Sequence, residues 1–195
     1  MTDLAARPLP RRRPDELTAS QREVYDAIVG ARRGVAISGG LLDEHGGLHG
    51  PFNAMLLSPE LGGRLQTVGD GVRKHTSLSA RVREIAVLVV AAVQDSDFER
   101  WAHEQIARNA GFTDDELAAL RRIPDEVSAA EWPDPGDLLI VRTSRALAVD
   151  GDLDDELYAA ATEHLGVEGL FELLTLVGYY ALLALQLRVF RVPVP

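Results

Sequence analysis

The residues with the clearest potential for chemistry are one histidine and two glutamates near the middle of the chain. Glu99 and His103 are four positions apart in a segment with helical spacing, so their side chains share one helix face. Glu84 precedes them on another helical segment, and a turn at Asp95–Ser96 is expected to fold the two segments antiparallel. Both Glu84 and His103 can then approach the shared interface. A histidine flanked by carboxylates can shuttle protons, because its pKa is near neutrality and a carboxylate can fix its tautomer.

The same residues also have a purely structural interpretation. Ser96-x-x-Glu99 has the form of a capping box, which accounts for both residues without any function. A glutamate and a histidine at i,i+4 often form only a surface pair worth a few tenths of a kcal/mol. Spacing alone therefore leaves both interpretations open.

The charge composition of the chain limits the classes of molecule that it can be expected to bind. The chain has 195 residues, and 20 Lys and Arg stand against 30 Asp and Glu, for a formal net charge of -10. Such a surface repels phosphate groups, so we expect neither nucleic acid nor an anionic membrane as a partner. The basic cluster at Arg11, Arg12 and Arg13 lies among prolines, which predicts a disordered N-terminal arm over residues 1–16. Residues 17–195 are then expected to form a single helical domain.

The chain contains no cysteine. This excludes disulfides, thiolate metal sites and every mechanism that uses a cysteine nucleophile or redox pair. The N-terminus has no apolar stretch after its basic residues, so no signal peptide is expected. The most apolar segment, residues 173–187, spans 15 residues. It is shorter than a bilayer of roughly 30 Å requires, so we expect a buried helix and a cytoplasmic protein.

Helical periodicity and capping signals recur along the chain, and no segment alternates with period two long enough to predict a strand. The predicted class is all-α. Glycine-rich residues 38–53 are expected to be a loop, and prolines at 124, 133 and 135 mark a linker. Helices are predicted at residues 18–34, from Ser58–Pro59 through Val72, from Ser79 to the break at Asp95–Ser96, and at 96–110, 113–122, 137–149, 154–165 and 167–188.

Residues 51–120 resemble a known family. The segments that carry the resemblance are 50–59 (GPFNAMLLSP), 83–88 (REIAVL), 98–104 (FERWAHE) and 107–111 (ARNAG). They are similar to the carboxymuconolactone decarboxylase family, which also contains the alkylhydroperoxidase-D-like proteins. The peroxidase branch carries a Glu, then Cys-x-x-Cys, then a His four positions later. Those positions fall on Glu84, Ser96, Glu99 and His103, so both thiols are missing and hydroperoxide reduction by a cysteine pair is excluded.

The resemblance therefore points to the non-redox branch. It implies an alkylhydroperoxidase-D-like helical bundle, with the core motif in residues 51–120, an N-terminal extension and a helical region at 137–195 that ends in a long helix. The implied reaction is cofactor-independent decarboxylation of a small carboxylated cyclic or unsaturated metabolite. His103 would be the general acid/base, Glu84 its orienting or relay partner, and Glu99 a second acid/base group or a pocket residue. The resemblance also implies a homo-oligomer built from trimers.

A carboxylated substrate needs a cation, and the sequence does not rank Lys74, His75, Arg81, Arg83 and Arg100. The substrate-binding candidates are Phe52, Asn53, His75, Arg81 and Trp101, although aromatic residues are more often core or interface anchors. His45 and His49 are four apart in the glycine-rich loop, but no carboxylate cluster completes a metal site there, so neither a metal nor a cofactor is expected.

Two alternatives to a decarboxylase stay open: a different lyase, hydratase or isomerase on the same scaffold, or a non-catalytic helical binding protein.

Overall fold

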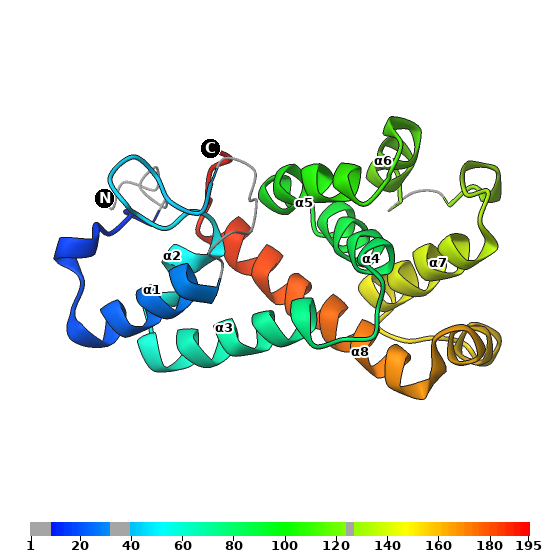
Figure 1. The fold of residues 1–195 in the computed structure, drawn as a ribbon. Helices are drawn as coiled ribbons and strands as arrows, with labels where there is room; N and C mark the ends of the chain where they lie inside the picture. Colours follow the sequence, from blue (N-terminus) through cyan, green and yellow to red (C-terminus); the bar gives the residue numbers. More distant parts are fainter. Residues whose placement is uncertain (1–8, 32–39, 124–126) are drawn as a thin grey trace, which may run out of the picture.

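The computed structural model describes residues 9–31, 40–123 and 127–195, and within these ranges it contains eight α-helices and no β-strand (Figure 1). This confirms the all-α class. The helices are α1 (Ala19–Ala31), α2 (Pro51–Met55), α3 (Pro59–Lys74), α4 (Ala80–Val93), α5 (Asp97–Asn109), α6 (Asp114–Arg121), α7 (Pro135–Val149) and α8 (Asp155–Val189), with 3-10 turns at Pro14–Glu16 and Ala129–Glu131.

The centre of the fold is α4, which packs against α5, α6, α7 and α8. Its two sides belong to different hydrophobic clusters. Val87 and Val90 face a cluster shared with α1, α2, α3 and α8, whereas Ile85 and Val89 face a cluster shared with α5, α6 and α7. A helix enclosed on two sides must be apolar nearly all round. The glutamate that α4 buries among these residues, Glu84, is therefore conspicuous.

The sequence signals placed most helix ends well. Thr18 and Gln21 form a capping box, and so do Thr113 and Glu116. The first helix was expected to reach about Gly34; α1 is described as far as Ala31, and residues 32–39 lie outside the described ranges. The loop predicted over 38–53 is wrong at its end, because α2 begins at Pro51. Proline is preorganised for the first helical position, and that signal was overlooked.

The last helical region contains the break that the sequence predicted. Gly166 has φ 74° and ψ 165°, so α8 consists of two helices that meet there. By length and composition α8 could cross a membrane. Half of its most apolar stretch is nevertheless buried within the fold, and it runs between α3 and α4 (Figure 1). Leu173, Leu176 and Tyr180 are core residues there.

The arm predicted to be disordered over residues 1–16 makes specific contacts in its described part. Arg11 pairs with Asp43 at 3.7 Å, and the Arg12 amide donates to Asn53 Oδ1 at 3.4 Å. Asn53 in turn donates to the Pro10 carbonyl at 3.3 Å. These contacts correct the expectation for residues 9–16, because the sequence pattern could not show that a loop and a buried amide receive the arm. Residues 1–8 lie outside the described ranges.

Candidate active site

The three-residue turn between α4 and α5 sets the geometry of the site. Asp95 adopts φ 50°, the left-handed conformation in which a helix commonly ends. The Ser96 amide then donates to Ala91 O at 2.8 Å and the Asp95 amide to Ala92 O at 3.2 Å, which closes α4. Ser96 is at once the N-cap of α5. The turn is so short that α4 and α5 return side by side, and Glu84 faces His103 across their interface.

His103 lies between two carboxylates. Its Nδ1 is 2.8 Å from Glu84 Oε2 across the helix interface, and its Nε2 is 3.5 Å from Glu99 Oε2 on its own helix. All three residues are buried, with exposed fractions of 8% for His103, 7% for Glu84 and 3% for Glu99. Glu84 is therefore placed to hold a proton on Nδ1, which leaves Nε2 on the side of Glu99.

The structural alternative for Glu99 fails. Ser96 makes no side-chain capping bond, and its Oγ is buried without a hydrogen-bond partner in the part of the chain that the structure describes. The capping box predicted at Ser96 is thus not formed. Glu99 instead points toward the imidazole.

The pKa of His103 reflects a competition between burial and charge. Burial alone lowers it, because an apolar surrounding disfavours the imidazolium. The charge of Glu84 and its hydrogen bond raise it, and the charge of Glu99 adds to them. The carboxylates prevail over both burial and the nearby charge of Arg73, so the pKa of His103 lies above its ordinary value. The ring stays protonated over a wider pH range than a free histidine.

A small enclosed cavity of about 90 Å³ adjoins this cluster. That volume corresponds to roughly three water molecules. Its walls are mostly apolar, with Glu99, His103, Arg73, His49 and Tyr180 as the polar exceptions. The full lining is Gly40, Leu41, His49, Pro51, Phe52, Arg73, Phe98, Glu99, Ala102, His103, Ile106, Tyr180 and Leu183.

Arg73 is the cation of this cavity, and the sequence analysis missed it. Its Nη2 atom is buried and has no hydrogen-bond partner among the described residues. A guanidinium with a buried, unmet donor favours an anion, because planar N–H groups suit a carboxylate. One signal was available: Gly62, Gln66 and Gly69 mark a buried non-apolar stripe on α3, and Arg73 continues it at helical spacing.

Tyr180 and His49 complete the polar side of the cavity. The Tyr180 ring stands edge-on to His103, with centroids 5.1 Å apart, and burial, reinforced by the charge of Glu99, raises the pKa of its phenol. His49 was expected to be solvated, yet it is only 6% exposed and its Nδ1 lacks a partner within the described ranges. Burial and then the charge of Arg11 lower the pKa of His49, which favours its neutral form.

Of the predicted substrate-binding residues, the structure brings only Phe52 to the cavity. Asn53 turns away to hold the N-terminal arm. Trp101 packs on Phe98 with centroids 5.5 Å apart, and His75 lines a separate groove between α3 and α8. These placements correct the sequence hypothesis for Asn53, Trp101 and His75.

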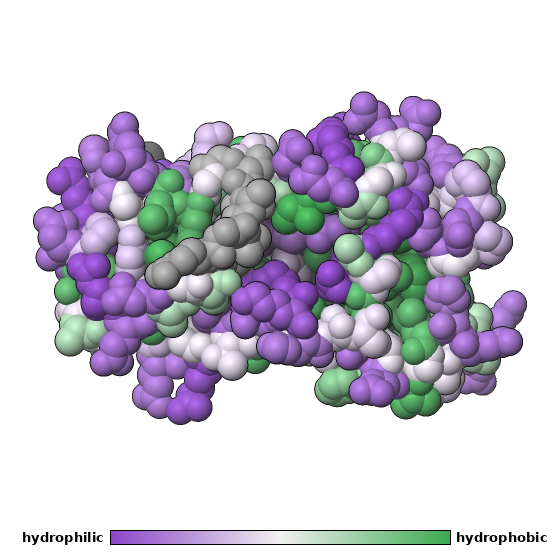
Figure 2. All heavy atoms as spheres, viewed as in Figure 1, coloured by the Kyte–Doolittle hydropathy of each residue, from purple (hydrophilic) through white to green (hydrophobic). Residues whose placement is uncertain are grey.

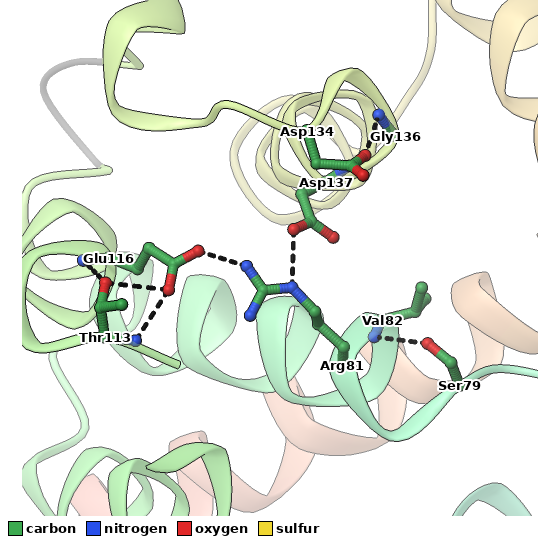
Figure 3. A network of polar contacts seen from close by, with 8 residues as sticks. All are labelled: Ser79, Arg81, Val82, Thr113, Glu116, Asp134, Gly136 and Asp137. Carbon is green, nitrogen blue, oxygen red and sulfur yellow. Dashed lines mark hydrogen bonds and ion pairs between the residues drawn. The ribbon is translucent and has the colours of Figure 1, made fainter. Parts of the chain in front are cut away.

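Arg81 is also elsewhere, because it ties three helices together (Figure 3). It reaches from the start of α4 to Glu116 of α6 and, at 2.6 Å, to Asp137 of α7. Its guanidinium also lies 4.3 Å from the centre of the Phe112 ring. Glu116 and Asp137 lie in the first turns of α6 and α7, so Arg81 joins the starts of these helices to α4. Arg81 is therefore a structural residue and not a substrate ligand.

The remaining candidate cations are engaged too. Lys74 pairs with Asp70 at 2.7 Å, Arg83 donates to the Leu78 carbonyl and Arg100 pairs with Asp97.

A more open depression of about 700 Å³ lies between α7 and the start of α8, where apolar side chains gather in Figure 2. It has no histidine. Across the residues that the structure describes, no group of three or more His, Asp or Glu is placed to hold a metal ion.

Comparison with known proteins gives one match. No curated protein matches the chain. A family model does match, over residues 59–133, which contain Arg73, Glu84, Glu99 and His103. Residues 50–58, which contributed to the resemblance, fall outside that range. This part of the chain, residues 59–133, is thus similar to the Carboxymuconolactone decarboxylase family.

Proposed function

We propose that this chain is a cofactor-independent acid–base enzyme that decarboxylates a small carboxylated cyclic or unsaturated metabolite at His103. The observation that carries the proposal is the buried imidazole held between Glu84 and Glu99 beside a cavity that also contains Arg73. A structural ion pair would need no cavity and would not leave a buried guanidinium donor unmet.

The raised pKa suits His103 to act as an acid. Glu84 accepts the Nδ1–H bond at 2.8 Å, so the proton on Nε2 is the one directed toward the cavity side. Donation of that proton leaves a neutral imidazole still held by Glu84, and water can restore the proton. A group with a pKa near the working pH performs both steps efficiently.

Arg73 is suited to hold a carboxylate that the product retains. Binding the leaving carboxylate would stabilise the ground state, because that charge disperses as carbon dioxide forms. The leaving group belongs instead against the apolar wall that Phe52, Phe98 and Leu183 provide. There its negative charge is poorly solvated and its loss is favoured.

The chemical step balances without a cofactor. The bond between the substrate's carbon and its carboxylate breaks, and its electron pair moves into a neighbouring carbonyl to give an enolate. The His103 Nε2 proton then adds to the carbon that lost carbon dioxide. Neutral His49 and the un-ionised phenol of Tyr180 are the uncharged polar groups at hand to meet the enolate oxygen.

A second reaction class also fits the site. Glu99 and His103 provide a base and an acid on the same cavity, which is what a double-bond isomerase requires to move a proton between two carbons. An isomerase would exchange a substrate hydrogen with solvent and release no carbon dioxide.

The test is a carbon dioxide release assay with carboxymuconolactone and related carboxylated lactones, run in deuterated water with product analysis by NMR. We expect carbon dioxide release with one deuteron added at the decarboxylated carbon. In His103→Gln, which cannot donate the same proton, turnover should fall by about 10²–10⁴-fold. His45→Gln is the matched control, because His45 is exposed and does not line the cavity. Unchanged turnover in His103→Gln would refute the role of His103, and deuterium exchange without carbon dioxide would favour the isomerase.

A further inference from the structure

The second part of α8 carries a stripe of exposed apolar side chains. Six large residues on it are between 41% and 67% exposed: Val167, Phe171, Leu174, Leu182, Leu185 and Val189. With exposed Gly178 in the middle, their spacing is 4, 3, 4, 4, 3 and 4 residues, which follows one side of an α-helix. The stripe is about 33 Å long at 1.5 Å per residue. A continuous apolar stripe of this kind marks an interaction surface.

The stripe is symmetric about Gly178. Residues at equal distances on either side of it have similar character, since Val167 mirrors Val189 and Leu174 mirrors Leu182. Phe171 mirrors Leu185 in the same way. A two-fold axis through Gly178 would set each residue against its mirror position in an antiparallel copy. This self-complementarity is what a two-fold symmetric interface between identical chains requires.

The charges at the ends of the stripe obey the same symmetry. Glu168 and Arg188 lie ten residues before and ten after Gly178, and both are exposed. An antiparallel copy therefore places Glu168 opposite the partner's Arg188, twice in the same interface. Within its own chain Arg188 donates only to the Gln94 carbonyl, at 3.3 Å, among the contacts of the described residues. Opposite charges at mirror positions favour this pairing, whereas a parallel arrangement would oppose like charges.

The glycine at position 178 is a further reason to expect two copies of α8 to pack closely. Glycine within a helix costs roughly 1 kcal/mol relative to alanine. A Cβ atom at this position would meet nothing within 4 Å, so no described part of the same chain requires a glycine here. Two helix backbones can approach most closely where both lack a side chain. A second copy of α8 crossing at Gly178 accounts for the residue.

We propose that two copies of this chain pair through the second part of α8, antiparallel, about a two-fold axis at Gly178. The stripe alone is narrower than a standard interface, which buries about 800 Å² on each partner. The neighbouring groove of about 330 Å³, which Val68 of α3 and Phe171 line together, extends the surface. The axis brings the partner's Leu185 onto Phe171 at the rim of that groove. This interface does not depend on which reaction His103 performs.

Cross-linking tests the axis directly, because the chain has no native cysteine. Gly178→Cys should give a disulfide-linked dimer on mild oxidation, since only a residue on the axis meets its own copy. Leu174→Cys alone should cross-link poorly, but a mixture of Leu174→Cys and Leu182→Cys chains should form the mixed dimer. Val149→Cys is the control, because Val149 is 47% exposed and lies on α7.

The oligomeric state of unlinked protein gives an independent test by analytical ultracentrifugation. Gly178→Glu places two like charges at the axis, so the dimer dissociation constant should rise by about 100-fold or more. The monomer should keep its helical circular dichroism, because the site is open. Glu168→Arg and Arg188→Glu should each weaken the dimer, and the double variant should restore it. Val149→Glu should leave it unchanged.

Three results would overturn the proposal. One is a chain that stays monomeric at all concentrations tested, including a chain that instead binds phosphatidylcholine vesicles through this stripe. Another is an oligomer, such as a trimer, that forms without the Gly178→Cys cross-link and is insensitive to Gly178→Glu. The third is failure of the charge exchange to restore pairing. A hexamer that contains the cross-linked pair supports the proposal.

Discussion

Two clusters in this molecule have nearly the same composition and different properties. Around Arg81, one cation lies between Glu116 and Asp137; around His103, one imidazole lies between Glu84 and Glu99. Arg81 is held by close bonds to both carboxylates and covers an aromatic ring, so its bonding capacity is used within the fold. His103 has one close bond, a second carboxylate at 3.5 Å and a cavity beside it. The hydrogen bonds that Arg81 makes lie within the fold and stabilise it. His103 keeps one nitrogen without a close bond beside a cavity, where it can exchange a proton with a substrate.

The two clusters also differ in the chemistry of their central cation, which is a guanidinium in one and an imidazole in the other. A guanidinium keeps its charge at every ordinary pH, so the Arg81 cluster does not lose its cation near neutrality and holds the starts of α4, α6 and α7 together there. An imidazole changes charge near neutrality, and the carboxylates around His103 shift that change to higher pH. The comparison predicts that substitutions around His103 act mainly on function, whereas substitutions around Arg81 act mainly on stability.

After the loss expected for His103→Gln, the largest expected effect within this comparison is that of Glu84→Gln on turnover, a loss of about 100-fold. The amide can still accept the Nδ1–H bond, but it removes the charge that raises the pKa of His103. The decline of activity with rising pH should therefore move to lower pH. NMR titration of His103 together with the pH profile of kcat measures both. An unshifted histidine titration would contradict the role assigned to Glu84.

Arg81→Met should give the next largest effect, a loss of about 2 kcal/mol in the free energy of unfolding. The substitution leaves Glu116 and Asp137, each with a side chain only 14% exposed, without their shared cation. Urea denaturation gives the value, and the titration of His103 serves as the internal control. If turnover fell while stability stayed unchanged, Arg81 would be a functional residue after all.

The pH dependence of stability should separate the clusters further. A folded-state pKa above the unfolded value gives His103 a stabilising contribution that is fully present below the unfolded pKa, near 6.5. That contribution is lost as pH rises through the folded pKa, by about 1.4 kcal/mol for each unit of difference. Denaturation of the wild type and of His103→Gln from pH 5 to 9 measures it. A flat difference between the two chains would show that the carboxylates do not raise this pKa.

The smallest expected effect distinguishes Ser96 from a true cap. Ser96→Ala should change the free energy of unfolding by less than about 0.5 kcal/mol, because the hydroxyl has no capping bond to lose. Thr113→Ala is the matched comparison, and it should cost about 1 kcal/mol, since Thr113 and Glu116 form a complete capping box. Equal losses in thermal denaturation would restore the capping interpretation of Ser96 and Glu99.

The sequence pointed to the three central residues of the candidate site and, of the cavity walls, only to Phe52. The i,i+4 spacing of Glu99 and His103 and the turn at Asp95 are local features, and they were enough to predict the shared interface. Arg73, His49 and Tyr180 come from three other segments, and only packing brings them to the cavity. Arg81 was misjudged because a sequence shows a charge without showing the partners that neutralise it.

The sequence by itself determined the helical class, most helix ends and the break at Gly166. These depend on interactions within a few residues: caps, prolines at helix starts and glycines in left-handed conformations. It also excluded thiol chemistry, since the chain has no cysteine. The tertiary structure alone decided which charges are paired, which side of His103 stays open and which apolar face of α8 remains uncovered. Those properties depend on burial and distance between remote segments, and no local pattern encodes them.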